Sequence, residues 1–174
     1  GEHTWGGRDE SECPTAMMMI EQLEALGLQR GATARETLKV ITELAEKYGY
    51  GDRGEALAIA DKDEIWLLEI TGPGAFWKPE SGKPGAVWAA VRVPDDSYSV
   101  GANRSRIGEI NFSDQANFMY SSNIKDIAKD MGWWKEGEKF VFYKVYGPEA
   151  KGRSPYLSQR REWRACGLLS PSVK

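Results

Sequence analysis

Apolar residues at helical spacing predict two helices in the first third of the chain. The first helix is expected to begin at Pro14, because proline suits the first helical position and the apolar residues after it fit one helical stripe. The second is expected over residues 34–48, where apolar side chains recur at steps of three and four. Thr33 and Glu36 have the spacing of a capping box, and Gly49 stands where a left-handed residue ends many helices.

Short apolar runs then predict a four-stranded antiparallel meander. A polar turn at residues 61–64 separates the first two runs, and Pro94 fixes the backbone of a turn between the last two. Residues 71–85 contain four glycines and three prolines, so this segment is predicted to be a long loop. The expected strands cover residues 55–60, 65–70, 86–93 and 97–103.

The last third of the chain mixes helical and extended patterns. Ser122 or Asn123 can cap a short helix that ends at Gly132, and residues 139–147 are predicted to form one further strand. In the tail, arginines accompany apolar residues, which favours a basic amphipathic helix that ends before Pro171. Helices on both sides of a run of strands predict an α+β fold, in which a sheet packs one face against helices.

The composition is that of a folded domain without a strong excess of either charge. The chain has 174 residues, a length that fits one domain, and a formal net charge of −3. It has no long basic run, which argues against a nucleic-acid partner, and no apolar stretch approaches the ~18 residues of a membrane span. Two cysteines and one histidine are too few for a disulfide framework or a zinc site, so metal chemistry would need carboxylates alone. The small number of cysteines favours a reducing cytoplasm.

Six short motifs follow one another along nearly the whole chain. They are EHTWGGR (2–8), ELAEKYGYG (43–51), IWLLEI (65–70), VWAAVRVPDD (87–96), GANRSRIGEI (101–110) and MGWW (131–134). Each motif alone is weakly specific. Their order and spacing together resemble the cysteine dipeptidases of the dipeptidase A type, relatives of the secernins within the N-terminal-nucleophile hydrolases.

The resemblance implies a four-layer αββα sandwich with a mainly antiparallel sheet. It also implies that a cysteine, the first residue of the mature chain, hydrolyses dipeptides without a metal or cofactor. The free α-amino group of such a cysteine can act as the general base, so the thiol must belong to residue 1. Residue 1 here is glycine, and family members are considerably longer. Residues 1–174 are therefore expected to be a single-domain interior portion of a longer catalytic domain, without the nucleophile.

An interior portion of this kind is expected to be inactive alone. It would expose a sheet edge and a helix face that the remainder of the parent polypeptide normally covers. Exposed sheet edges and apolar faces associate readily, so oligomers or aggregates are predicted unless a partner covers them.

Asn103, Arg104 and Arg106 are the main candidates for the site. N-terminal-nucleophile amidases commonly use an asparagine amide as a neutral donor to the oxyanion, and Asn103 is expected at a strand end where it can do so. Arg104 or Arg106 can bind the free carboxylate that distinguishes a dipeptide from a longer chain. Alternatively, Asn103 only tolerates a left-handed turn, and the arginines are solvated surface residues.

Glu2 and Thr4 match polar positions of the first motif in the family. A carboxylate at Glu2 can receive the α-ammonium group of the substrate. His3 and Trp5 are larger than the residues expected there, and this affects the expected shape of the pocket.

Two other functions remain open from the sequence. The chain can be a non-catalytic peptide-binding or scaffold module that uses the aromatic residues Phe76, Trp77 and Trp88. It can also be a self-contained thiol hydrolase that uses Cys13, although Glu12 and the acidic residues before it disfavour a thiolate there.

Overall fold

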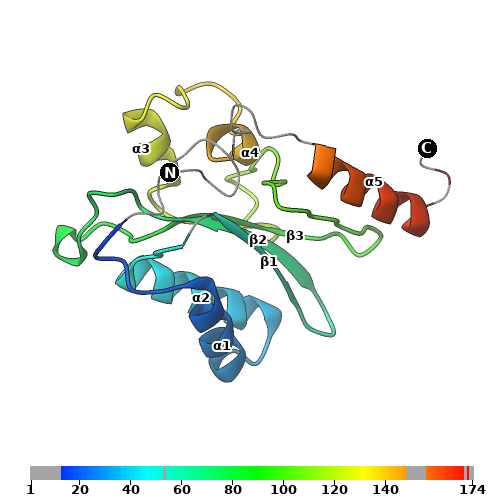
Figure 1. Ribbon diagram of the computed structural model, residues 1–174, viewed down its shortest axis with the longest axis horizontal. Helices are drawn as coiled ribbons and strands as arrows, with labels where there is room; N and C mark the ends of the chain where they lie inside the picture. The colour runs from blue at the N-terminus through cyan, green and yellow to red at the C-terminus, as the bar shows by residue number, and fades with distance from the viewer. Residues whose placement is uncertain (1–12, 53, 148–155, 171, 173–174) are drawn as a thin grey trace.

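The computed structural model describes residues 13–52, 54–147, 156–170 and 172, and within these residues the fold is α+β. Figure 1 shows a sheet with α1 (Ile20–Arg30) and α2 (Ala34–Tyr48) on one side. On the opposite side lie α3 (Ile124–Asp130), α4 (Phe142–Val145) and α5 (Tyr156–Leu169). The predicted α+β class is confirmed.

The sheet has four strands in chain order, and all neighbours are antiparallel. The strands are β1 (Glu55–Ala60), β2 (Ile65–Thr71), β3 (Val87–Arg92) and β4 (Phe118–Tyr120). The first three confirm the strands predicted from the apolar runs. Between β2 and β3 the long loop is present as predicted, with one short 3-10 helix at Pro79–Ser81.

Alternation along the strands divides the apolar side chains into two cores. Trp66, Leu68 and Ile70 of β2 pack in one core with the buried faces of α1 and α2. Leu67 contributes to the other core, which also contains Val87 and residues of α3 and α4. The sheet is therefore apolar on both faces, and the two faces have different partners.

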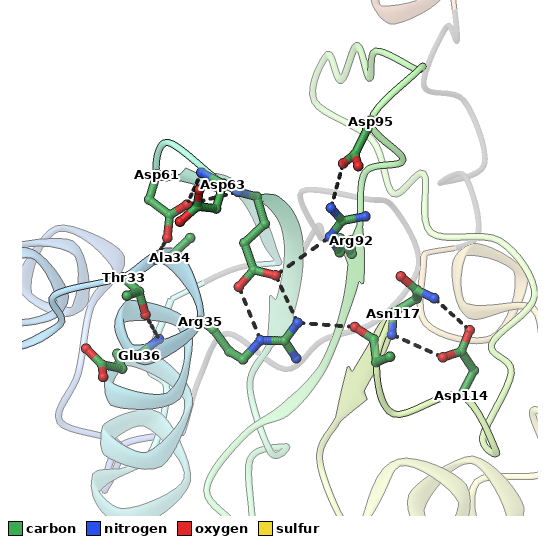
Figure 2. Close-up of polar contacts among 12 residues, drawn as sticks. Thr33, Ala34, Arg35, Glu36, Asp61, Asp63, Arg92, Asp95, Asp114 and Asn117 are labelled. Carbon is green, nitrogen blue, oxygen red and sulfur yellow. Dashed lines mark hydrogen bonds and ion pairs between the residues drawn. The ribbon is translucent and has the colours of Figure 1, made fainter.

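The second helix is confirmed from Ala34 to Tyr48, with an N-terminus more elaborate than the predicted capping box. The hydroxyl of Thr33 accepts the Glu36 N–H at 3.2 Å, as predicted, but the Glu36 carboxylate accepts the Ala32 N–H at 2.9 Å. Asp61, in the turn after β1, accepts the Ala34 N–H at 2.7 Å (Figure 2). Asp61 therefore satisfies one of the first helical N–H groups from outside the helix.

The first helix begins at Ile20, so the predicted start at Pro14 is wrong. The backbone of Met17 and Met18 is extended instead, and both N–H groups donate to the Gly49 carbonyl, at 3.2 and 2.9 Å. Gly49, at the end of α2, has φ 81°, a conformation that favours glycine. Hydrogen bonding to this distant segment is what keeps the methionine run out of the helix.

The fourth predicted strand, residues 97–103, is also wrong. Pro94 lacks the N–H that a continued strand would use, and the Ser97 N–H donates to the Pro94 carbonyl at 3.0 Å, which closes a turn. The chain leaves the sheet there, and β4 pairs with β3 instead. Residues 97–103 run along one face of the sheet as an irregular segment.

The strand predicted over residues 139–147 forms only one isolated bridge, between Glu109 and Val141, before α4 begins. Phe142, Val145 and Tyr146 are all buried. They are spaced three and four residues apart, which suits a helix facing a core better than a strand. The predicted helices near residue 124 and in the tail are confirmed as α3 and α5.

Among the described residues, no helix combines the length and apolar character needed to cross a membrane.

Candidate active site

A groove of about 630 Å³ lies on the sheet face opposite α1 and α2. Its floor is formed by alternate residues of β1 and β2, and its wall by the segment that leaves β3 at Pro94. Ala56, Ala58 and Ala60 provide the β1 part of this floor, and their small side chains leave space above the strand. The groove contains three of the residues proposed from the sequence: Asn103, Arg104 and Arg106.

Asn103 is the non-glycine residue with positive φ among the described residues, at 52°. It lies in an irregular loop and is exposed, so its predicted place at a strand end is wrong. The left-handed conformation agrees with the alternative that asparagine tolerates such a turn. The Asn103 Oδ1 accepts a hydrogen bond from Arg161 Nη2 of α5 at 2.8 Å. The amide oxygen of Asn103 is thus held by α5.

Arg104 and Arg106 converge on one carboxylate, that of Glu162 on α5. Arg104 Nε lies 3.0 Å from Glu162 Oε1, and its Nη2 contacts Oε2. Arg106 Nη1 lies 2.8 Å from the same Oε2. Glu162 is only 5% exposed. Two guanidinium groups thus bind one buried carboxylate, and the Arg104 contact is two-pronged.

Glu69 is a second buried carboxylate of this region, in the middle of β2. It is fully buried, and it faces the segment that follows Asn103. Its Oε2 accepts the Ser105 hydroxyl, and its Oε1 accepts the N–H groups of Arg106 and Ile107, the latter at 3.1 Å. Burial raises the pKa of Glu69, and these three hydrogen bonds oppose that shift.

The described residues that line the groove include no cysteine, histidine or lysine. The groove combines guanidinium groups with an asparagine amide, which together can hold a carboxylate and a developing oxyanion. The described part of the chain contains no cluster of three or more side chains suited to a metal ion.

Cys13 is buried outside the groove. Its thiol donates to the Trp77 carbonyl at 3.4 Å, and Thr15 Oγ1 donates to the same carbonyl at 2.6 Å. The cysteine therefore helps to fix the loop between β2 and β3. Cys166, on α5, is partly exposed, and neither thiol is in a disulfide.

The aromatic residues proposed for a binding module do not form one surface. Trp77 and Trp88 are buried, and their indole N–H groups donate to the Lys83 carbonyl at 2.9 Å and to Glu46 at 2.8 Å. Phe76 alone of the three is exposed, at 97%. An aromatic binding surface made of all three residues is therefore contradicted.

Glu2 and Thr4, proposed to contact the substrate, lie outside the described residues, as do His3 and Trp5.

The sequence interpretation did not identify Glu69, Arg161 and Glu162 as members of this region. A signal for Glu69 existed, because an acidic residue within the apolar run 65–71 must find hydrogen-bond donors if the strand is buried. No local signal connects α5 with Asn103, since 58 residues separate Arg161 from it. Only the tertiary fold brings them together.

Comparison with known proteins gives a family match over most of the chain. The model of a family described as peptidase family C69 matches residues 9–174. A probable dipeptidase of Salmonella dublin is 32% identical over 154 residues, which cover 88% of this chain and 32% of that protein. Dipeptidase A of Lactobacillus helveticus is 31% identical over 139 residues, 80% of this chain and 26% of that protein. A probable dipeptidase of Latilactobacillus sakei is 28% identical over 142 residues, 82% and 27% respectively.

The matched region thus spans about a quarter to a third of the length of these relatives.

Proposed function

The chain belongs to peptidase family C69, which confirms the resemblance seen in its motifs, and we propose that it forms part of an enzyme that hydrolyses dipeptides. The similar proteins named dipeptidase support this reaction. In the proposal, residues 1–174 supply a sheet, its helices and part of the substrate pocket. A cysteine outside these residues supplies the nucleophile.

The convergence of Arg104 and Arg106 on one carboxylate oxygen carries the proposal. A dipeptide differs from an interior segment of a longer peptide in its free terminal carboxylate, and paired guanidinium groups recognise that group with good geometry. In the structure, the carboxylate of Glu162 binds both guanidinium groups. A substrate carboxylate would therefore replace Glu162, and the affinity for the substrate would be lowered by the free energy of breaking that contact.

Asn103 is proposed as the oxyanion donor. Attack of a cysteine thiolate on the peptide carbonyl places a negative charge on the carbonyl oxygen, and a side-chain N–H can stabilise that charge. The collapse of this intermediate expels the amine of the second residue, which takes up a proton, and leaves a thioester. Water then hydrolyses the thioester. Asn103 lies in the same groove as the arginines, which supports its assignment to the same substrate.

The proposal also concerns the rest of the polypeptide. We expect a four-layer αββα sandwich that the remainder of the polypeptide completes. Alone, residues 1–174 are expected to be inactive and to form oligomers or aggregates. The two free cysteines favour a reducing compartment, the cytoplasm.

The test compares dipeptide hydrolysis by residues 1–174 with hydrolysis by the polypeptide extended upstream in its natural reading frame to the first cysteine. Turnover in the longer polypeptide alone is the expected result. Its loss when that cysteine is changed to alanine would assign the nucleophile, with Cys13→Ala as the matched control that leaves turnover intact.

Turnover by residues 1–174 would contradict the proposal, and its loss in Cys13→Ala would then support a self-contained thiol hydrolase. Tight dipeptide binding without turnover in either polypeptide would favour the binding module.

A further inference from the structure

We propose that Glu69 is a positioning residue of this site: its buried carboxylate holds the backbone of residues 105–107 and so sets the directions in which Asn103, Arg104 and Arg106 enter the groove. This inference rests on the proposed function and assigns Glu69 a part in it.

The sheet makes room for this carboxylate. Glu69 pairs with Ala56 of β1 on one side and with Ala89 of β3 on the other. Both neighbours are alanine, so the carboxylate has no large cross-strand neighbour and the loop can approach the sheet directly. A full charge in this position is costly unless several donors meet it.

Three donors of one short segment meet the carboxylate. The Ser105 hydroxyl donates to one oxygen, and the N–H groups of Arg106 and Ile107 donate to the other. Because two of the donors are consecutive backbone N–H groups, Glu69 fixes the path of the main chain as well as one side chain. Removal of the carboxylate would leave the buried Ile107 N–H without this acceptor.

The same segment is anchored on its far side. The carbonyls of Ile107 and Gly108 accept the N–H groups of Tyr143 and Phe142, both at 3.0 Å. On the N-terminal side of residues 105–107 lie Arg104 and Asn103, which line the groove. Glu69 therefore acts at the junction between the anchored part of the loop and the part that meets substrate.

The test uses the complete polypeptide that hydrolyses dipeptides, with Glu69→Gln as the main variant. Glutamine keeps the volume, but it retains only one neutral acceptor oxygen and replaces the other oxygen with an NH2 group, which is a donor. The three donors of residues 105–107 therefore no longer all meet a carboxylate oxygen. We expect kcat/KM to fall roughly tenfold to a hundredfold, the range that a small displacement of catalytic groups causes. Hydrogen exchange in the peptide that contains residues 103–107 should be at least about tenfold faster, because weaker hydrogen bonds to residue 69 let this segment open more easily. A tenfold faster exchange corresponds to a free energy of local opening that is lower by about 1.4 kcal/mol.

Glu46→Gln is the matched control. Glu46 is a half-buried carboxylate that accepts the Trp88 indole N–H, and Trp88 belongs to the core on the opposite sheet face. This variant also removes a carboxylate next to the sheet, but it should change neither the exchange of residues 103–107 nor kcat/KM.

A double-mutant cycle separates positioning from a general loss of stability. If Glu69 acts through Asn103, adding Glu69→Gln to Asn103→Ala should reduce kcat by less than about threefold, because the group to be positioned is already gone. A fully additive loss in kcat would overturn the inference. Unchanged exchange at residues 103–107 would also overturn it, whatever the activity.

Failure of the proposed function would be seen in a different variant from failure of the Glu69 inference. If Asn103→Ala leaves kcat unchanged, the oxyanion assignment fails, and the Glu69 inference is decided by the exchange measurement and by the effect of Glu69→Gln on KM. Should Glu69→Gln not fold, Ser105→Ala removes one of the three donors, and the same readouts decide with smaller expected changes.

Discussion

Asn103 combines a backbone requirement with a chemical group, and the two can be separated by substitution. Its φ of 52° lies in the region that costs an ordinary residue about 1–2 kcal/mol. Glycine adopts this backbone conformation freely but lacks the side-chain amide. Alanine lacks the amide and is also strained in this conformation.

We expect Asn103→Gly to keep the free energy of unfolding within about 0.5 kcal/mol of the parent, since glycine accepts this conformation freely. In the longer polypeptide that we propose to hydrolyse dipeptides, the same variant should lower kcat by about 10²–10³, the usual effect of deleting an oxyanion donor. Urea unfolding and steady-state kinetics measure the two effects. A normal kcat in Asn103→Gly would reduce Asn103 to a turn residue.

At the scale of elements, the N-terminus of α2 is joined to the β1–β2 turn and to the segment before β4. Figure 2 shows Arg35 reaching from α2 toward Arg92 and Asn117. Its Nε and Nη2 donate to Glu64 at 3.2 and 2.9 Å, and Nη2 also donates to the Ala116 carbonyl at 3.2 Å. The Arg35 guanidinium also lies 4.6 Å from the centre of the Trp66 ring. One side chain thus connects a helix, a hairpin and a loop.

Arg35→Lys should destabilise the fold by about 1 kcal/mol, because a lysine cannot keep the two-pronged contact or the ring stacking. The charge is unchanged, so the loss reports geometry. The matched control is Lys62→Ala, which breaks an ion pair whose side chains are 86% and 71% exposed and should alter the free energy of unfolding by less than about 0.5 kcal/mol. Equal effects in the two variants would contradict the role of Arg35 in joining α2 to the hairpin and the loop.

The hydrogen bonds of Asp61 predict that the stability of the junction between α2 and the β1–β2 turn depends on pH. Hydrogen bonds from the N–H groups of Ala34, Asp63 and Glu64 hold the pKa of Asp61 below its ordinary value. The stabilisation is therefore present above the unfolded pKa of about 3.9 and is lost as the pH falls through the lower folded pKa. The Tm of Asp61→Asn should lie below that of the parent at neutral pH, and the difference should shrink in acid. A difference independent of pH would show that the charge of Asp61 is unimportant.

For the whole molecule, the two cores lie on opposite sheet faces, and Ile107 joins the loop of the groove to the second core. Gly147, just after α4, lies against this loop: a Cβ there would stand 2.4 Å from the Ser105 Cβ. The packing of α4 is thus in contact with the segment that Glu69 holds.

We expect Gly147→Ala to displace Ser105 and to lower kcat/KM of the complete enzyme several-fold, together with a lower Tm, because overpacking typically costs about 1–3 kcal/mol. Gly108→Ala is the matched control from the same loop, since a Cβ there has nothing within 4 Å. It should change both quantities little. Similar losses in the two variants would show general sensitivity of the loop to a methyl group.

Much of the fold was predictable because its signals are local. The stripe and caps of α2, the β1–β2 hairpin and the glycine- and proline-rich loop each depend on neighbouring residues. The errors arose where distant hydrogen bonds decided the outcome. Gly49 keeps the methionine run extended, and β4 takes the edge of β3 that residues 97–103 were expected to take.

The candidate site was predictable only in part for the same reason. Asn103, Arg104 and Arg106 lie in one motif, so a family resemblance could identify them together. Their partners Glu69 and Glu162 are 36 and 58 residues away from the residues that they contact, at Ser105 and Arg104. No spacing rule connects residues so far apart in the chain.

The position of α5 provides a natural site for a fluorescent label near the groove. Cys166 lies one helical turn after Glu162 and is partly exposed, whereas Cys13 is buried. In residues 1–174, a maleimide dye should therefore attach to Cys166 before Cys13. If a dipeptide carboxylate displaces Glu162 from Arg104 and Arg106, the helix beneath the dye changes its contacts, and the emission of the dye becomes a titration signal for ligand entry.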